Sequence, residues 1–392
     1  MICPKLSTNL KHYSMITKIK FKNYKAFPDL EELELRPVTL IIGKNSSGKS
    51  SILKLIALLT SMVNENFWIP SLKVNEIVLG GSYQDLFHNG SMADLNLEVE
   101  LENGLTVTLN FFVNDSIIKI YSYTCQKNGE ILCQVRKESR DDNLEEQLSR
   151  FISENQIGVD NSSVLNYIGP IRRMAPENIR FHGFSKGYSV KYDGAGAYDI
   201  LLNSFIRGGE CFNKVSSWMD KHLEGQKLSF SNMSNNSGNY TLWVKRKGTE
   251  VNIAEVGQGV AQVLPIVTLA TVAEPNSINI IEQPELHLHP AAHANVAELI
   301  GRSATNHHNV FVVESHSKNL LLGFQKMIVN KNISFTPDDI AIYYVMDTEE
   351  GATLKRIYVD EKGEFDDWPL GVFSESFELT KEINRYLNDS VC

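Results

Sequence analysis

An eight-residue loop pattern constrains this chain more than any other feature of its sequence. The pattern has two glycines and a Lys-Ser pair, as phosphate-binding loops do, and reads Gly43-Lys44-Asn45-Ser46-Ser47-Gly48-Lys49-Ser50. The β-branched run at 38–42 favours a buried strand before the loop, and the apolar run at 52–59 favours a helix after it. A chain with this strand, loop and helix is expected to bind a nucleoside triphosphate.

The position of the loop at a helix N-terminus explains why phosphate would bind there. Unpaired backbone N–H groups and about half a positive charge of helix dipole favour an anion. Lys49 is expected to contact the β and γ phosphates, and Ser51 continues the loop into the helix. Ser50 is expected to hold Mg²⁺ through its hydroxyl, because this ion takes few protein oxygens beside phosphate and water. The predicted cofactors are therefore ATP and Mg²⁺.

Composition limits the class of protein. The chain has 392 residues, enough for roughly two to three lobes. Its five cysteines include no Cys-x-x-Cys pair, which suits a reducing cytoplasm and argues against a structural zinc site. The sequence has no apolar run of about 18 residues, and its segment through Ser14 has no apolar h-region of the kind that a signal peptide needs. We therefore expect a soluble cytoplasmic protein without membrane contact. A net charge of −9 restricts any nucleic-acid contact to a local patch.

The rest of the chain divides by its hydrophobic pattern. Residues 16–35 predict two strands, which we expect to enter the sheet of the phosphate-binding loop. From Asp94 the strict alternation and the turn at Asn103-Gly104 predict an antiparallel arm of four strands. After residue 239, strands alternate with helices, which is typical of an α/β sheet. No heptad run is long enough for an extended coiled coil.

Three segments in the second half predict the remainder of a nucleotide site. An apolar strand at 278–281 leads into Glu282 and Glu285, carboxylates suited to holding Mg²⁺ or aiming a water. The segment Gly257-Gln258-Gly259 precedes a helix and offers a second set of N–H groups to phosphate. His316 follows another buried strand and could contact the γ phosphate.

This ordered set resembles the ATP-binding cassette heads of the SMC and RecF-like group. The resemblance covers most of the chain and includes these motifs in family order: Asn23 to Phe27 with Lys25, the loop from Gly43, the signature-like Val256 to Gln262, the Walker-B-like Ile278 to Glu285, the D-loop region His287 to Pro290, and His316. The chain is most similar to the compact AAA-family ATPases of bacterial anti-phage systems, such as the Septu type. Ile168 to Arg172 and Asp367 to Pro369 resemble motifs of that subgroup.

The resemblance implies an α/β fold, an ABC-type ATPase head with a mixed sheet, flanking helices and an inserted antiparallel β arm. The expected domains are an ATPase lobe at 1–90 with the phosphate-binding loop, the β arm at 91–140, a helical and loop insertion at 141–250, and a second ATPase lobe at 251–392. The resemblance also implies a homodimer, and higher oligomers are not excluded. In it, the loop of one copy and the signature region of the other enclose each ATP.

The sequence departs from the family pattern in two places. Val256 stands near the position of the signature serine, and Gln283 replaces the acid that usually follows the metal-binding carboxylate. Because loss of a general base costs about 10²–10⁴ in rate, hydrolysis is expected to be slow unless Glu285 orients the water. Glu282 is then the expected metal ligand, and Gln84 is the candidate for the Q-loop.

Three weaker patterns could indicate other functions, but for each we prefer a structural interpretation. The hydrolase-like pentapeptide Gly183 to Gly187 lacks the flanking strand and helix of a nucleophile elbow. A zinc cluster is a minor alternative for the histidines of the D-loop region, namely His287, His289 and His293. Five basic residues alternate with aromatic ones and could contact nucleic acid, although a solvated surface is the commoner reading of such a segment. They are Arg172, Arg173, Arg180, Lys186 and Lys191.

The leading functional hypothesis is a dimeric ATPase that senses infection or DNA state. It would hold or release a separate effector, expected to be a nuclease, in anti-phage defence. Two alternatives stay open, a RecF-like repair ATPase that acts on DNA directly and an ATP-binding scaffold with negligible turnover. The trigger and the identity of the effector are not encoded in any motif that we recognise.

Overall fold

The computed structural model describes residues 15–136, 143–154, 164–184, 189–232, 238–368 and Phe373. One of its two large sheets is antiparallel and has the order β2-β1-β6-β7-β8-β9. Its strands are β1 (Ile16–Lys22), β2 (Glu31–Glu34), β6 (Leu95–Leu101), β7 (Leu105–Asn114), β8 (Ile117–Lys127) and β9 (Glu130–Arg136). The four strands expected for the arm are confirmed, including the turn at 103–104 between β6 and β7.

The expectation that residues 16–35 enter the sheet of the phosphate-binding loop is wrong. β1 instead pairs antiparallel with both β2 and β6. The reason lies in its alternation, because Ile19 and Phe21 are fully buried on one face. On the other face Lys18 and Lys20 form ion pairs with neighbouring strands. Such a one-sided strand suits an antiparallel sheet with a wet face, whereas a central parallel strand must be apolar on both faces.

The second large sheet has the order β10-β15-β16-β3-β17-β18. Its strands are β3 (Val38–Gly43), β10 (Leu165–Ile168), β15 (Ile278–Glu282), β16 (Val310–Glu314), β17 (Ile340–Thr348) and β18 (Gly351–Ile357). All neighbours are parallel except β18, which runs antiparallel to β17. β3 is buried on both faces, with Leu40 in one hydrophobic core and Ile41 in the other. This double burial explains the continuous apolar run in the sequence.

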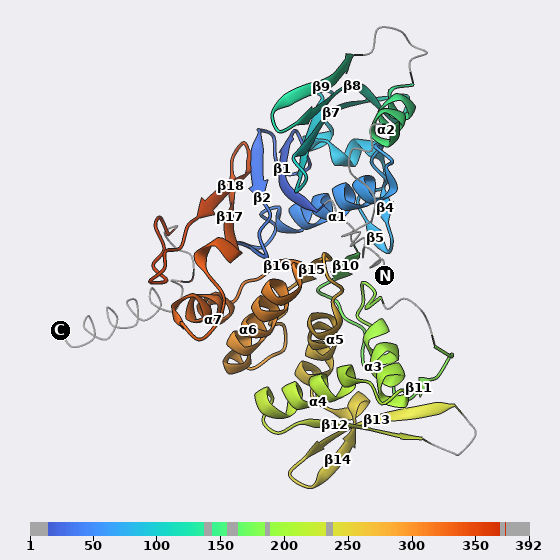
Figure 1. Cartoon of the computed structure of the whole chain (residues 1–392), viewed down its shortest axis with the longest axis vertical. Coiled ribbons are helices and arrows are strands. Elements are labelled where there is room, and N and C mark those ends of the chain that lie inside the picture. Colours follow the sequence, from blue (N-terminus) through green and yellow to red (C-terminus); the bar gives the residue numbers. More distant parts are fainter. Residues whose placement is uncertain are drawn as a thin grey trace, which may run out of the picture.

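The two sheets and the helices form layers (Figure 1). Helix α1 (Lys49–Glu65) shares a core with the antiparallel sheet and with one face of the parallel sheet. The opposite face of the parallel sheet is covered by α5 (Gln258–Val272), α6 (Pro290–His307) and α7 (Lys318–Val329). The loop between β3 and α1 therefore lies where both sheets meet.

The range 141–250, expected to be helices and loops, also contributes strands. It holds α2 (Leu144–Glu154), α3 (Gly196–Ile206) and α4 (Glu210–His222), and it supplies β10 to the parallel sheet. A smaller antiparallel sheet contains β11 (Ile179–Arg180), β12 (Lys227–Asn232), β13 (Asn239–Arg246) and β14 (Thr249–Asn252). The short pair β4 (Lys73–Val74) and β5 (Ile77–Val78) lies after α1.

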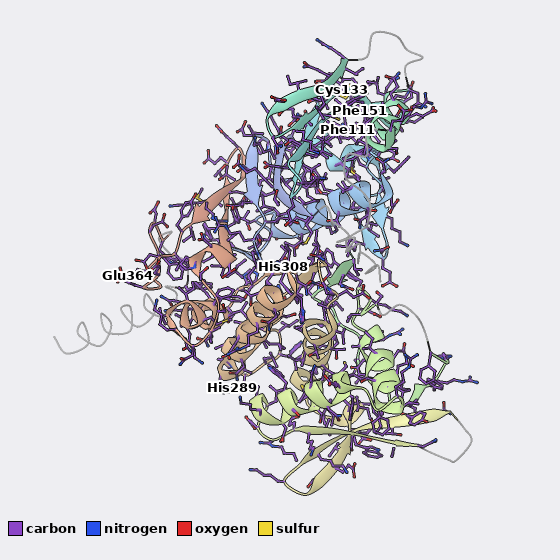
Figure 2. All side chains as sticks on the ribbon, viewed as in Figure 1. Phe111, Cys133, Phe151, His289, His308 and Glu364 are labelled. Carbon is purple, nitrogen blue, oxygen red and sulfur yellow. The ribbon has the colours of Figure 1, made fainter. Side chains whose placement is uncertain are left out.

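Side chains from distant parts of the chain fill the cores (Figure 2). Phe111, labelled in Figure 2, is fully buried in the antiparallel sheet. In the parts of the chain that the structure describes, no helix is both long and apolar enough to cross a membrane.

Candidate nucleotide site

The phosphate-binding loop has the predicted position, since β3 ends at Gly43 and α1 begins at Lys49. Gly43 and Gly48 have φ values of 156° and 106°, which side-chain-bearing residues rarely adopt. A Cβ at Gly43 would lie 2.8 Å from the main-chain oxygen of Val345, and one at Gly48 would lie 3.1 Å from Ala26. Both glycines are therefore required by the turn itself, before any ligand is considered.

Lys49 is buried at the start of α1, with 4% of its surface exposed. Its Nζ donates to the main-chain oxygens of Gly43 at 3.2 Å and Lys44 at 2.6 Å. Nζ also lies 3.8 Å from Oε1 of Glu314. Burial lowers the pKa of Lys49, while Glu314 and Glu282 oppose that shift. The ammonium group is thus held across the loop, where it can exchange carbonyl partners for phosphate oxygens.

Two carboxylates meet at Ser50. Parallel pairing of β15 and β16 sets Glu282 directly beside Glu314. The Ser50 Oγ lies 3.3 Å from Oε2 of Glu282 and 3.1 Å from Oε2 of Glu314. The hydroxyl of Tyr167, from β10, donates to Oε1 of Glu282 at 2.8 Å. These oxygens form a donor set of the kind that Mg²⁺ prefers, with one hydroxyl and one or two carboxylates.

The environment of the two carboxylates raises the pKa of both. Burial raises the pKa of Glu282. Burial and the charge of Glu282 together raise the pKa of Glu314 to about 7. A divalent cation between them would lower both pKa values again, because its positive charge stabilises the ionised carboxylates.

Sequence reasoning gave Glu314 and Tyr167 no role. A signal for Glu314 was present, because the apolar run at 310–313 ends in a carboxylate just as the run at 278–281 does. Only the parallel register of β15 and β16 places the two carboxylates together. Tyr167 had no comparable signal, since its contact depends on β10 joining the far edge of the sheet.

Glu285 and His316 lie just beyond the ends of β15 and β16. Oε1 of Glu285 accepts hydrogen bonds from Ser315 Oγ and from the main-chain N of His316, both at 2.8 Å. Its Oε2 is buried and has no hydrogen-bond partner among the described residues. Burial and the nearby Lys49 lower the pKa of His316. One oxygen of the carboxylate is therefore fixed by hydrogen bonds, and the other is an acceptor that has no partner among the described residues, beside the cavity that Glu285 lines.

These residues line a cavity of about 610 Å³ that a nucleotide phosphate chain could enter. Its lining includes Asn45 of the loop together with Gln283, Glu285 and His316. Gln283 has a φ of 45°, and its main-chain N donates to the oxygen of Glu314 at 2.8 Å. The structure thus brings together the phosphate-binding loop, the carboxylates and the histidine that the sequence predicted.

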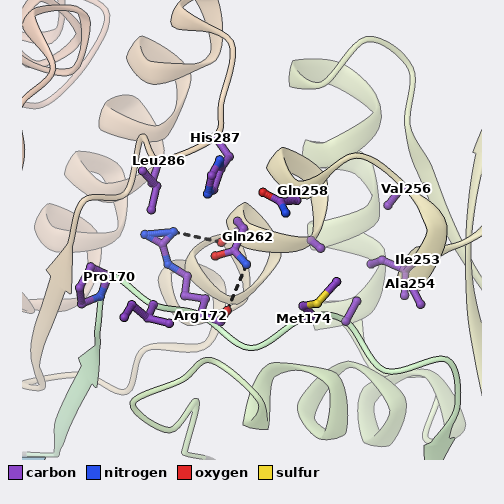
Figure 3. A pocket seen from close by; sticks show the side chains of 13 residues that line it. Pro170, Arg172, Met174, Ile253, Ala254, Val256, Gln258, Gln262, Leu286 and His287 are labelled. Atoms are coloured by element: carbon purple, nitrogen blue, oxygen red, sulfur yellow. Dashed lines mark hydrogen bonds between the residues drawn. The ribbon is translucent and has the colours of Figure 1, made fainter.

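The signature-like segment lies elsewhere. Gly257 and Gln258 are exposed at the start of α5, and neither lines the cavity at the loop. Gln258 instead lines a second cavity of about 240 Å³, together with Arg172 and His287 (Figure 3). A Cβ on Gly259 would lie 2.4 Å from the main-chain oxygen of His287, so glycine is needed there for close packing.

Comparison with known proteins agrees with this geometry. Residues 38–323 match the model of a family described as "AAA domain, putative AbiEii toxin, Type IV TA system". This chain belongs to that family. Residues 335–383 match a second family model, described as a protein of unknown function (DUF3696). No curated protein matches the chain significantly.

A solved structure shows that this AAA-family chain has the fold of an SMC head. A crystal structure of the SmcHead bound to the C-winged helix domain of ScpA is 15% identical and has a TM-score of 0.53, covering 89% of this chain and 99% of that one. The SMC head domain from Thermotoga maritima is also 15% identical, with a TM-score of 0.44, and covers 88% of this chain and 99% of that one. The fold class expected from the sequence is confirmed.

Membership of this AAA family makes the chain a P-loop ATPase that binds ATP.

Two further residues that the sequence predicts at the nucleotide site, Gln84 and Lys25, form hydrogen bonds with nearby main-chain oxygens. The amide of Gln84 donates to the main-chain oxygens of Gly90 and Ser91, at 2.7 and 2.8 Å. The Nζ of Lys25 donates to the main-chain oxygen of Leu79, while the turn that carries Lys25 packs Ala26 against Gly48.

The histidines of the D-loop region have structural partners. His289 caps α6, since its Nδ1 accepts from the main-chain N of Ala291 at 3.3 Å. His293 pairs through Nδ1 with Ser317 Oγ at 2.7 Å and through Nε2 with the oxygen of Leu288 at 3.2 Å. Among the described residues, no three His, Cys, Asp or Glu side chains are grouped so as to hold a metal ion. The D-loop reading of these residues needs no zinc.

One of the five basic residues considered for nucleic-acid contact, Arg172, does not lie on the surface. Arg172 is only 4% exposed, and its guanidinium donates to the main-chain oxygens of Glu282 and Gln283. The cause is its position between α5 and the end of β15, where it satisfies carbonyls that burial would otherwise leave unpaired. Lys186, another of the five, and Ser185 of the hydrolase-like pentapeptide lie outside the described residues.

Proposed function

We propose that this ATPase works as a homodimeric switch in anti-phage defence. Bound nucleotide would decide whether a separate effector protein, expected to be a nuclease, is held or released. In this proposal Ser50 and Glu282 hold Mg²⁺, Glu285 orients the attacking water, and His316 contacts the γ phosphate. The family description, which names a toxin and a type IV toxin–antitoxin system, supports a defence setting.

The observation that carries the proposal is the convergence at the loop. Ser50 contacts the carboxylates of both Glu282 and Glu314. Lys49 lies beside Glu314. Glu285 offers a buried oxygen without a partner in the described chain, beside a cavity large enough for phosphate groups. Preorganised groups of this kind are what phosphoryl transfer to water requires.

The exposed signature-like segment supports a dimer. Gly257 and Gln258 present the N-terminus of α5 at the surface, away from the cavity at the loop of the same chain. A second copy could bring this helix N-terminus to the triphosphate, which would complete the anion site in the presence of ATP. Closure of such a dimer would couple nucleotide state to the shape of a partner-binding surface.

The proposal is tested by identifying what co-purifies with the native protein in the presence of ATP, using mass spectrometry. A nuclease-like protein retained by the wild type and lost from Lys49→Ala would support effector control. A dimer that carries DNA and no protein partner would overturn it and favour direct action on DNA.

Gln283 favours a second candidate function, an ATP-binding scaffold with negligible turnover. A glutamine can orient a water without accepting its proton, and this one lies in the cavity beside Glu285. ATP hydrolysis by the wild type that falls about 10²–10⁴-fold in Glu285→Gln would exclude the scaffold. Equal and negligible turnover in both proteins, with ATP binding intact, would establish it.

A further inference from the structure

Glu314 occupies a position that the proposed roles leave unexplained. Its Oε2 lies 3.1 Å from Ser50 Oγ, slightly closer than the 3.3 Å of Glu282. Its Oε1 lies 3.8 Å from Nζ of Lys49. The side chain therefore faces both groups of the loop that are expected to meet the nucleotide and its metal ion.

The contacts of Glu314 distinguish it from a water-activating base. Glu285 and Gln283 line the cavity at the loop, but Glu314 does not. Glu314 is only 4% exposed and is enclosed by Glu282, Ser50 and Lys49. A group this deep beneath the loop can reach an ion at Ser50 more readily than a water beyond the γ phosphate.

Charge also favours a cation between the two carboxylates. With Glu282 and Glu314 both ionised, Lys49 is the one cation within 4.0 Å of either group among the described residues. Like charges so close in a buried site repel strongly, and a divalent ion between them would remove that repulsion. Two carboxylates are within the number that protein sites use to bind Mg²⁺ beside phosphate oxygens and water.

We propose that Glu314 is a second carboxylate ligand of the metal ion that accompanies the nucleotide. The ion would then be held between the ends of β15 and β16, with Glu282 on one strand and Glu314 on the other. Tyr167 fixes the first carboxylate through its hydrogen bond, and Lys49 restrains the second. This inference rests on the proposed nucleotide-dependent function and adds a ligand to the same site.

The test measures metal and nucleotide binding separately, without turnover. Mn²⁺ is titrated into protein saturated with a non-hydrolysable ATP analogue, and free Mn²⁺ is followed by electron paramagnetic resonance. Glu314→Gln should weaken Mn²⁺ binding by about 10-fold or more, since even outer partners of metal ligands contribute about 10–100-fold. In EDTA the same variant should bind the analogue more tightly than the wild type does, because a negative charge near the triphosphate has been removed.

These opposite changes separate a ligand from a residue that only supports the fold, which would weaken both. Glu274→Gln is the control, because this exposed carboxylate precedes β15, at the opposite end of the strand from Glu282, and its loss should leave Mn²⁺ affinity unchanged. Unchanged Mn²⁺ affinity in Glu314→Gln, with the analogue still bound, would overturn this inference alone. Failure of the wild type itself to bind the analogue would instead overturn the proposed function.

Discussion

At the scale of single residues, Lys49 and the carboxylates of the site are each held by a partner that limits what they can do. Lys49 is held by two loop carbonyls, and one oxygen of Glu285 is held by Ser315 and His316. Such restraints reduce the reorganisation that phosphoryl transfer would otherwise need. Because each of these groups has its own partners, each single substitution is expected to change a different property of the site.

Lys49→Ala should weaken binding of ATP by roughly 10- to 100-fold, because a charge-assisted hydrogen bond contributes about 1.5–3 kcal/mol. A titration with a fluorescent ATP analogue measures the effect. Lys331→Ala, an exposed lysine beyond α7, is the control and should bind as the wild type does. Equal affinities in all three proteins would show that the loop does not bind the triphosphate.

The raised pKa of Glu314 predicts how stability depends on pH in protein free of metal and nucleotide. This pKa is about 7 in the folded state and has an ordinary value of 4.5. Between these values the folded state binds more protons than the unfolded state, so the free energy of unfolding falls as pH rises. The loss between about pH 5 and about pH 8 should reach about 3 kcal/mol at most.

Urea unfolding in EDTA at those two pH values checks this expectation. Glu314→Gln should lose less stability than the wild type, because its side chain does not ionise. Magnesium and a non-hydrolysable analogue should reduce the dependence in the wild type. The same loss in wild type and variant would contradict a raised pKa at Glu314.

At the scale of elements, Arg172 joins the start of α5 to the end of β15. Its guanidinium donates to the main-chain oxygens of Glu282 and Gln283. The amide of Gln262 donates to the main-chain oxygen of Arg172 at 3.2 Å, as Figure 3 shows. The helix that begins with the signature-like segment is thus tied to the turn that carries Glu285. Burial lowers the pKa of Arg172 to about 10, so the guanidinium stays protonated near neutral pH.

Arg172→Ala should destabilise the protein by about 2–4 kcal/mol, since it leaves buried carbonyl groups unpaired. It should also lower kcat more than ATP affinity, because the displaced turn carries Glu285 rather than the loop. Arg173→Ala is the matched control, as its side chain is 67% exposed. Unfolding curves and steady-state ATP hydrolysis measure both effects, and equal results for the two variants would contradict the coupling.

Much of the element layout could be predicted from the sequence, because local pattern determines it. The β3 run, the loop glycines and the hairpin at 103–104 each carry their signal within a few neighbouring residues. β1 was misplaced because a short alternating strand does not specify which sheet it joins. Glu314 and Tyr167 were missed because their roles depend on strand order, which no local pattern encodes.

At the scale of the whole molecule, the loop lies at the junction of the two large sheets. α1 packs between them, and the hydroxyl of Tyr343 on β17 accepts from the main-chain N of Glu34 on β2 at 2.7 Å. Oε2 of Glu31 accepts from the main-chain N of Leu354 on β18 at 3.0 Å. Phosphate binding at the loop would therefore act on both lobes together, as a switch that reshapes a surface requires.

In the proposed function, ATP closes two copies of this chain around shared nucleotide sites. Analytical sedimentation of the Glu285→Gln variant tests this closure directly, because the variant should bind ATP but hydrolyse it slowly. The variant is measured in Mg²⁺ under three conditions, with ATP, with ADP and without nucleotide. A dimer in ATP alone, reverting to monomer in ADP and absent from a Lys49→Ala double variant, is the expected result. The same mass under all three conditions would contradict a nucleotide-driven switch.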